Sequence, residues 1–308
     1  MNISVSVIVL TYKQPEVLKL IIESLNQQTY SGNVEVIVAD DGSPNLLATM
    51  NIMATTKSTH PIKYVWHTDL GFRAATARNN GICLAQNELL IFLDGDIVPY
   101  EDLIEKHVAQ HQEPKQLVAG NRTWLGEQSD IDALNNLERV VPDAAALRRG
   151  QTENMYRHKL LSSQHPWRAC FSANLSLRKS SFVLFDERFI GWGPEDAEFC
   201  YRMCVKHGLT PIYDETIGSY HLESPDAVGN VFRKNNHSDI VDYIRNTFLF
   251  FDNCPGLDLE DAFYGFRRLV LNKDTNRWSA IPRSEVEECD LGKIVGITRE
   301  WINRNKTP

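Results

Sequence analysis

A short, unbroken apolar run that ends in two aspartates constrains the fold of this chain more than any other feature. Leu89 to Leu93 are all apolar, and Asp94-Gly95-Asp96 and then Pro99 follow them. Such a run favours a strand buried on both faces of a parallel sheet, because a half-exposed strand alternates polar and apolar residues. Carboxylates at the carboxyl end of a central strand lie where open α/β sheets bind ligands.

Asp94 and Asp96 repel each other at such a position unless a cation lies between them. Hard oxygen ligands of this kind suit Mg²⁺ or Mn²⁺. An acidic turn after a strand is the alternative that the tripeptide alone leaves open.

The first hundred residues alternate between apolar strands and helices. The expected strands are Ser4–Tyr12, Val34–Ala39, Ile62–Trp66 and the run that ends at Leu93. The expected helices run from Pro15 to Gln28, over 46–53, and through the second part of 69–85. This β-α-β-α-β-α-β order predicts a parallel sheet with helices on its faces.

The alternation weakens after Pro99, and the segment 144–167 is too polar for an assignment. Further expected helices are 101–112, 131–141 and 194–207, and further strands are 116–124, 168–178, 210–213 and 219–221. Beyond Ser238 we expect the helices Ile240–Phe251, Leu257–Leu271 and Ser284–Asn303, with Ser284 and Glu287 at capping-box spacing.

Composition bounds the class of protein. A net charge of −8 argues against a nucleic-acid-binding protein with a broad basic face. No run of eighteen apolar residues exists and no basic segment precedes the first apolar stretch, so we expect neither a transmembrane segment nor a signal peptide. The 6 cysteines form no CxxC pair, which is typical of free thiols in a reducing compartment. A cytoplasmic protein is expected, with peripheral membrane contact left open.

Two acidic loops, Asp40-Asp41 and Asp94–Asp96, follow parallel strands and therefore point into the same crevice. One loop suits a nucleotide base or ribose and the other suits a metal on a diphosphate. The glycine-rich motifs of dinucleotide-binding and P-loop proteins are missing from the sequence.

A second group of candidate residues is Gly191-Trp192-Gly193-Pro194-Glu195-Asp196. Pro194 suits the first position of a helix, which places both acids in the first turn, where the helix dipole favours their ionised form. An ionised carboxylate at a cleft can take a proton from a hydroxyl group. Glycine permits close backbone approach and an exposed Trp192 suits a sugar, although acids are also common at helix N-termini for purely structural reasons.

The remaining candidates are basic or imidazole side chains. His221 follows a short strand and can complete a metal site begun by Asp96. His107 and His111 lack a matching third zinc ligand and are expected on a helix surface. Arg73 and Arg78 suit a diphosphate, with solvated helix charge as the alternative.

A series of motifs resembles the family 2 inverting glycosyltransferases of the GT-A fold. These motifs are SVIVLTYK, VIVADDGS, GFRAATARNNGI, FLDGDIVP, ANLSLRKSSF, FDERFIGWGPEDAEFCYRM and His221. The resemblance runs from Ser4 to about Ser224. GWGPED is similar to the C-terminal motif of β4-galactosyltransferases, polypeptide N-acetylgalactosaminyltransferases and bacterial chondroitin polymerases, although many relatives have a second glycine at Pro194.

The resemblance implies an α/β, Rossmann-like and mostly parallel central sheet flanked by helices, with a helical C-terminal extension. It implies a transferase domain over 1–237, divided into a nucleotide-binding half, 1–99, and an acceptor half, 100–237, with 238–308 packed on it. The later helices leave open a homodimer surface, an acceptor-binding element or a membrane patch around 247–251, with core packing favoured.

The resemblance also implies residue roles. Asp94-Gly95-Asp96 corresponds to the DXD motif that holds Mn²⁺ or Mg²⁺ on the UDP diphosphate, with Asp96, His221 and Asp94 as metal ligands. Asp196 corresponds to the catalytic base, and Glu195 to an acid that binds the acceptor beside Trp192 and Gly193. The implied nucleotide-sugar contacts are Thr11, Tyr12, Asp40, Asp41, Arg73, Arg78 and Asn79.

We therefore expect a metal-dependent hexosyl- or N-acetylhexosaminyltransferase of polysaccharide biosynthesis. It moves a sugar from a UDP-sugar to a hydroxyl acceptor such as a glycan, with inversion. The alternatives are a retaining N-acetylgalactosamine-type transferase, a nucleotidyltransferase and a non-catalytic nucleotide-sugar-binding module. The last is disfavoured by the intact Glu195-Asp196 pair.

Overall fold

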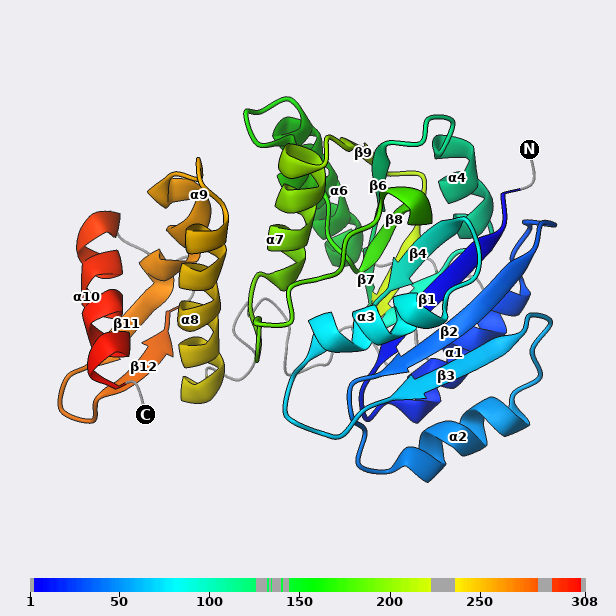
Figure 1. Cartoon of the computed structure of the whole chain (residues 1–308), viewed down its shortest axis with the longest axis horizontal. Coiled ribbons are helices and arrows are strands. Elements are labelled where there is room, and N and C mark those ends of the chain that lie inside the picture. The colour runs from blue at the N-terminus through cyan, green and yellow to red at the C-terminus, as the bar shows by residue number, and fades with distance from the viewer. Residues whose placement is uncertain are drawn as a thin grey trace.

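Figure 1 shows the computed structural model, which describes residues 3–125, 132, 134, 140, 144–222, 236–281 and 290–305. Its centre is a seven-stranded sheet in the order β3-β2-β1-β4-β8-β6-β9. The strands β1 to β4 are parallel, whereas β8 runs antiparallel to both of its neighbours, β4 and β6. The bounds are β1 Val5–Thr11, β2 Val34–Asp40, β3 Ile62–Trp66, β4 Leu89–Leu93, β6 Gln116–Gly120, β8 Asn174–Arg178 and β9 Thr210–Asp214.

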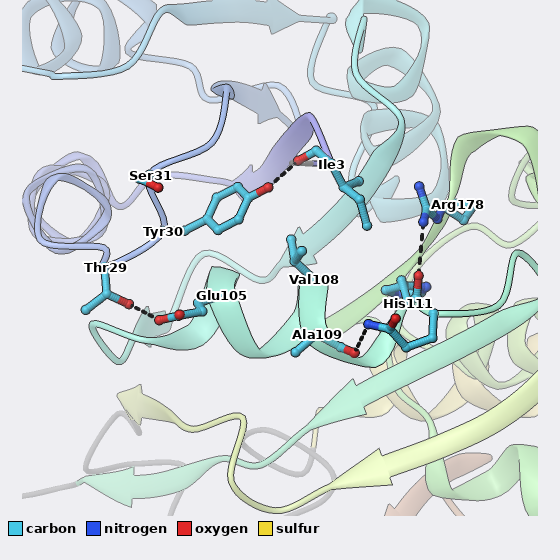
Figure 2. Close-up of a pocket in the computed structure, with 10 residues that line it drawn as sticks. Ile3, Thr29, Tyr30, Ser31, Glu105, Val108, Ala109, His111 and Arg178 are labelled. Carbon is cyan, nitrogen blue, oxygen red and sulfur yellow. Dashed lines mark hydrogen bonds between the residues drawn. The ribbon is translucent and has the colours of Figure 1, made fainter. Parts of the chain in front are cut away.

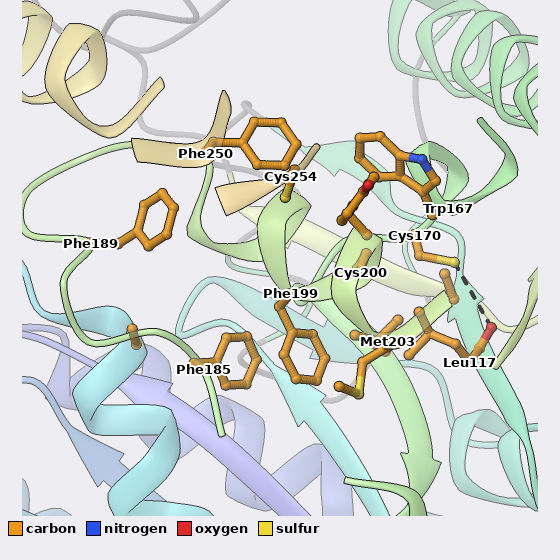
Figure 3. Packing of buried hydrophobic residues seen from close by; sticks show 14 of the residues in the cluster. Leu117, Trp167, Cys170, Phe185, Phe189, Phe199, Cys200, Met203, Phe250 and Cys254 are labelled. Carbon is orange, nitrogen blue, oxygen red and sulfur yellow. Dashed lines mark hydrogen bonds between the residues drawn. The ribbon is translucent and has the colours of Figure 1, made fainter. Parts of the chain in front are cut away.

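Helices cover both faces of this sheet. The helices α1 (Pro15–Asn26) and α4 (Leu103–Gln110) pack on one face, and α2 (Leu46–Thr55) lies against α1. The helices α3 (Ala74–Leu84) and α7 (Glu195–Tyr201) pack on the other face, where Figure 3 shows the rings and sulfur atoms around Phe199 and Met203.

The strand β4 explains why its sequence is apolar throughout. Leu89, Ile91 and Leu93 belong to the core beneath α1 and α4, whereas Leu90 and Phe92 belong to the core beneath α3 and α7. All five side chains are buried, as the unbroken run predicts. The predicted α/β fold with a central, mainly parallel sheet is therefore confirmed.

A second, three-stranded sheet lies beside the carboxyl end of β4. It contains β5 (Ile97–Pro99), β10 (Ser219–Leu222) and β7 (Thr123–Leu125), with β10 in the middle. Because β5 begins directly after Asp96 and His221 pairs with Ile97, this small sheet brings two distant parts of the chain together.

The C-terminal part forms its own layer beside α7 (Figure 1). It consists of the helices α8 (His237–Asn253), α9 (Leu259–Phe263) and α10 (Leu291–Arg304), the 3₁₀ helix η6 (Tyr264–Arg268), and a hairpin of β11 (Leu269–Asn272) and β12 (Arg277–Ala280). Phe250, Phe263 and Phe266 join the same core as α7, so this layer packs on the rest of the chain.

Several predicted elements differ from the structure. The segment 116–124 is two strands in two sheets, and 168–178 contains a strand only from Asn174, which is buried rather than half-buried because it lies between β4 and β6. A single helix over 257–271 is wrong, since the chain there turns into β11. The unassigned polar segment contains the helix α6 (Ala144–Leu161) and the 3₁₀ helix η1 (Pro166–Ala169).

Smaller differences concern helix ends. Pro194 is the N-cap of α7 instead of a residue of its first turn. Helix α7 continues into a π-helical turn, η3 (Arg202–Lys206). The 3₁₀ helix η2 (Lys179–Ser181) follows β8. Of the helix predicted over 131–141 the structure describes residues 132, 134 and 140, of which the first two are helical, and the capping box at Ser284 lies outside the described residues. No helix of the described part is long and apolar enough to cross a membrane.

Candidate active site

The carboxyl ends of β1, β2 and β4 meet at one edge of the sheet, and the two acidic loops lie there. Asp40 ends β2 and is buried. Its two carboxylate oxygens accept from the Ser43 backbone N–H at 2.7 Å and from the Tyr64 hydroxyl at 2.8 Å. Asp40 therefore closes the turn of its own loop.

Asp41 links this loop to the start of α3. Both of its oxygens accept from the Arg73 backbone N–H, at 2.9 and 3.1 Å, and His67 Nε2 lies 3.2 Å from Oδ1. Burial raises the pKa of Asp41 to about 6. The Asp41 backbone N–H donates to the Thr11 carbonyl oxygen, so the predicted nucleotide-sugar contacts Thr11, Asp41 and Arg73 lie together.

Tyr12, Asn79 and Gly95 have defined partners near the same edge. The Tyr12 hydroxyl donates to Asp69, while the Asn79 amide bonds both the backbone N–H and the carbonyl of Phe185. A Cβ on Gly95 would lie 2.5 Å from the Leu10 carbonyl oxygen, so only glycine lets this loop pass the end of β1.

Arg78 connects the DXD loop to the N-terminus of α7. Its guanidinium donates to Asp94 Oδ1 at 2.8 Å and to Glu195 Oε1 at 3.0 Å, and the side chain is buried. Although burial lowers the pKa of Arg78, the charges of Asp94 and Glu195 raise it overall. The alternative of solvated helix charge therefore does not hold for Arg78.

Asp196 lies on the same side of the sheet as this ion-paired group. Burial raises the pKa of Asp196, the Arg78 charge lowers it, and the Asp94 charge raises it again. Burial and the neighbouring Asp196 charge also raise the pKa of Glu195. The Ala197 backbone N–H donates to Asp196 Oδ1 at 2.7 Å.

Asp96 and His221 meet across β5 and β10. Asp96 Oδ2 lies 3.2 Å from His221 Nε2, and the two side chains are 18% and 12% exposed. Among the described residues His221 Nδ1 is buried without a hydrogen-bond partner, and no cluster of three acidic, histidine or cysteine ligands occurs. One carboxylate oxygen and one imidazole nitrogen fit a divalent cation that takes its other ligands from a diphosphate and water. Asp94, predicted as a further ligand, bonds to Arg78 through Oδ1, and its role as a ligand stays a prediction.

A mostly buried charged network lies behind His221, and sequence reasoning missed it. Glu153 of α6 accepts from Arg122 at 2.9 Å, from Trp124 Nε1 at 3.0 Å and from Arg157 at 2.6 Å. The Trp124 ring centroid lies 4.0 Å from that of His221. Although burial alone raises the pKa of Glu153, the two arginines lower it far below its ordinary value. No periodic pattern marks such a network, because its buried residues are charged.

His107 and His111 are buried, so their predicted place on a helix surface is wrong. His111 Nε2 lies 2.7 Å from Ser176 Oγ, which lies 2.8 Å from His107 Nδ1. His107 Nε2 lies 2.8 Å from Asn174 Oδ1, whose amide donates to the Ile217 carbonyl. This network assigns Nε2–H tautomers to both rings, and burial lowers their pKa values to about 4 and about 3.

A cavity of about 340 Å³ lies at the opposite, amino end of the parallel strands (Figure 2). Its polar side chains bond to one another: Tyr30 donates to the Ile3 carbonyl, Thr29 to Glu105, and Arg178 to the His111 carbonyl. This cavity is separate from the acidic edge and contains none of the predicted site residues.

Five cysteines of the described residues are free thiols, as the spacing predicts.

The segment that precedes the two acids of α7 is half-buried. Trp192 packs its ring against Tyr243 of α8, with centroids 5.3 Å apart, and Gly193 follows it beneath the same helix. The predicted exposure of Trp192 is therefore only partial.

Comparison with known proteins places this geometry in context. The model of glycosyl transferase family 2 matches residues 6–181, more than half of the chain. Validoxylamine A glucosyltransferase from Streptomyces hygroscopicus subsp. jinggangensis is 32% identical over 237 residues, covering 71% of this chain and 55% of that protein. Hyaluronan synthase from Pasteurella multocida is 31% identical over 267 residues, covering 79% and 27%. The chain thus spans about half the length of the first relative and about a quarter of the second.

Solved structures share the fold at low sequence identity. TarS 1–349 from S. aureus, in complex with UDP-GlcNAc, gives a TM-score of 0.55 at 17% identity, covering 85% of this chain and 70% of that one. The mannosyltransferase PcManGT from Pyrobaculum calidifontis, in complex with GDP-Man and Mn²⁺, gives 0.52 at 16% identity, covering 82% and 64%.

Proposed function

Because the chain belongs to glycosyl transferase family 2, we propose that it moves a sugar from a UDP-sugar donor to a hydroxyl acceptor, with inversion. One observation carries the proposal. The buried Arg78 guanidinium bonds both Asp94 and Glu195, so one side chain joins the DXD loop to the first turn of α7, which carries Asp196. A donor and an acceptor can therefore meet between two carboxylate groups.

Asp96 and His221 are the proposed ligands of Mn²⁺ or Mg²⁺. The metal, when bound, stabilises the negative charge that develops on the departing UDP. The complexes of TarS with UDP-GlcNAc and of PcManGT with Mn²⁺ support a nucleotide-sugar donor and a divalent cation for this fold. Trp124, Arg122 and Glu153 hold the His221 ring in place from behind.

Asp196 is the proposed general base. Its carboxylate takes the proton of the acceptor hydroxyl while the oxygen forms a bond to the anomeric carbon, and the bond from that carbon to the UDP oxygen breaks. A pKa raised by burial brings Asp196 closer to the optimum for proton transfer near neutral pH. Glu195, tied to Arg78, is placed to hold a second hydroxyl of the acceptor.

On the donor side, we place the uracil against Asp41, Thr11 and Tyr12, where the Arg73 backbone fixes the Asp41 carboxylate. We further propose residues 1–237 as the transferase domain, 238–308 as an extension, and a glycan as the acceptor. The names of the glucosyltransferase and hyaluronan synthase relatives support a hexose or N-acetylhexosamine donor in polysaccharide biosynthesis.

A screen of UDP-sugars tests the proposal. Purified protein is incubated with UDP-glucose, UDP-galactose, UDP-GlcNAc and UDP-GalNAc, with Mn²⁺ or with EDTA, and UDP release and acceptor products are measured. We expect Mn²⁺-dependent release from one donor and a β-anomeric proton signal in the NMR spectrum of the product made from these α-linked donors. An α-linked product would instead identify a retaining transferase, and binding of all four donors without turnover would identify a non-catalytic module.

A further inference from the structure

We propose that helix α8 positions the acceptor side of the site, with Asn246 as the positioning residue. The proposal rests on the assignment of Asp196 as the base, because its consequence is the placement of that carboxylate. The helix lies beyond residues 6–181, which the family model matches, and beyond the sequence motifs of the site.

Asn246 holds the backbone of the loop that leads into α7. The side chain is fully buried, and its amide nitrogen lies 3.0 Å from the Ile190 carbonyl oxygen, 3.3 Å from that of Gly191 and 3.5 Å from that of Trp192. One amide group thus faces three successive carbonyls. Its Oδ1 is buried without a hydrogen-bond partner among the described residues. The side chain thus bonds the loop through its nitrogen, while its buried oxygen bears the free-energy cost of an unsatisfied acceptor.

The two glycines of the loop are explained by α8. Gly191 has φ +77°, and a Cβ there would overlap the Asp242 carboxylate. A Cβ on Gly193 would lie 2.5 Å from the Asn246 Cβ. These glycines therefore serve close packing of the loop on α8, which revises the expectation that they admit a ligand.

Further contacts clamp the loop on both sides. Arg245 of α8 donates to the Ile190 carbonyl, and Tyr243 packs on Trp192. On the other side the Gly191 backbone N–H donates to the Phe72 carbonyl at 2.9 Å, one residue before the Arg73 N–H that bonds Asp41. The loop is therefore fixed between the donor-side loop and the C-terminal layer.

The position of the base follows from this clamp. Helix α7 begins at Glu195, directly after the loop, and is only seven residues long, so a displaced loop displaces both acids. Displacement of a reacting group by about 1 Å can lower a rate by about 10²-fold. Asn246 contacts the loop through backbone carbonyls, including that of Trp192, and its effect on Asp196 is transmitted by this loop.

The test compares Asn246→Asp with Thr247→Val in the full chain. Asn246→Asp replaces the amide donor by an oxygen that repels three carbonyls. Thr247 is equally buried and its hydroxyl bonds only within α8 among the contacts described, to the Tyr243 carbonyl, which makes it a matched control. Arg245→Met is the second variant, because Arg245 is 46% exposed and its loss does not threaten folding.

Three quantities are measured for each variant. They are amide hydrogen exchange over 189–196, UDP affinity with Mn²⁺ by calorimetry, and turnover of the UDP-sugar donor.

We expect Asn246→Asp to raise loop exchange by about tenfold or more and to lower turnover by about 10–100-fold, with the Kd for UDP within twofold. Arg245→Met is expected to raise loop exchange and lower turnover by smaller factors, and Thr247→Val is expected to match the parent in all three measurements. Wild-type exchange in both loop variants, or an equal effect of Thr247→Val, would overturn the role of α8. If Asp196→Asn keeps its turnover while Asn246→Asp loosens the loop, the base assignment fails and the clamp stands.

Discussion

Two groups of polar side chains at the central sheet use their hydrogen-bonding capacity in opposite ways. The closed cluster runs from the end of α4 to β8 and consists of His111, Ser176, His107 and Asn174. Its members are joined in this order by a series of hydrogen bonds. The open cluster contains four acids, one arginine and one histidine. It consists of Arg78, Asp94, Asp96, Glu195, Asp196 and His221.

The difference separates stability from function. In the closed cluster the hydrogen bonds between its members offset burial, although His111 Nδ1 has no partner among the described residues. Replacement of a member is therefore expected to weaken the fold and leave ligand binding intact. In the open cluster Arg78 is the basic side chain that contacts the acids of both loops, and the remaining carboxylate and imidazole atoms face a partly exposed space. Acidic and imidazole side chains gathered at a partly exposed edge suit a cation and a substrate.

The largest expected effect belongs to Asp196→Asn in the open cluster. Loss of a general base is expected to lower turnover by about 10²–10⁴-fold while the Kd for UDP stays within twofold. Asp214→Asn is the control, because Asp214 binds Gln110 and Thr216 at the end of β9, three strands away from β4 in the sheet. Turnover within threefold of the parent in Asp196→Asn would show that another group takes the proton.

Asp96→Ala tests the metal half of the open cluster. Without this carboxylate His221 is the single remaining proposed ligand, so we expect metal-dependent UDP binding to weaken by about 10²-fold, about 2.7 kcal/mol. Calorimetry with UDP in the presence of Mn²⁺ and of EDTA measures it. Equal metal dependence in the parent and in Asp96→Ala would remove Asp96 from the metal site.

The closed cluster is expected to respond to pH. Its histidines are neutral when folded, with pKa values lowered from 6.5 to about 4 and about 3, and the unfolded chain binds more protons. Their stabilisation is therefore complete above pH 6.5 and is lost as the pH falls towards 4. Between pH 7 and 5 the loss is about 2 kcal/mol for one histidine. Urea unfolding at both pH values should show a shallower decline in His111→Gln than in the parent, and identical declines would refute the assignment.

The smallest expected effect is that of Ser176→Ala. Removal of the hydroxyl leaves facing nitrogens of His107 and His111 without their partner, which costs about 1 kcal/mol of unfolding free energy. UDP affinity should not change. A change in UDP affinity with unchanged stability would reverse the distinction between the clusters.

The same contrast explains what could be predicted from sequence. Strands β1 to β4 and the loops after β2 and β4 follow from local apolar runs. Asp96, Asp196 and His221 were candidates from their sequence context, and the resemblance implied their roles. The closed cluster was missed because two histidines four residues apart on an amphipathic helix carry no sign of burial. Its partners lie on β8, about 65 residues away.

The supports of the open cluster were missed for a related reason. Glu153 and Arg157 lie in a helix whose polar sequence suggests no core position, yet they neutralise each other behind Trp124. Asn246 lies 50 residues beyond Asp196 and contacts backbone carbonyls, which have no signature in the sequence. Long-range pairing of polar groups is invisible to local periodicity.

A crystal of the protein grown with UDP and Mn²⁺ and measured at the manganese absorption edge tests the central claim most directly. We expect one anomalous peak within about 2.3 Å of both Asp96 Oδ2 and His221 Nε2, with the diphosphate on its other side and Asp196 facing the donor's sugar-bearing phosphate. Well-ordered UDP without a peak at these two atoms, or a peak at the His107–His111 cluster, would contradict the account.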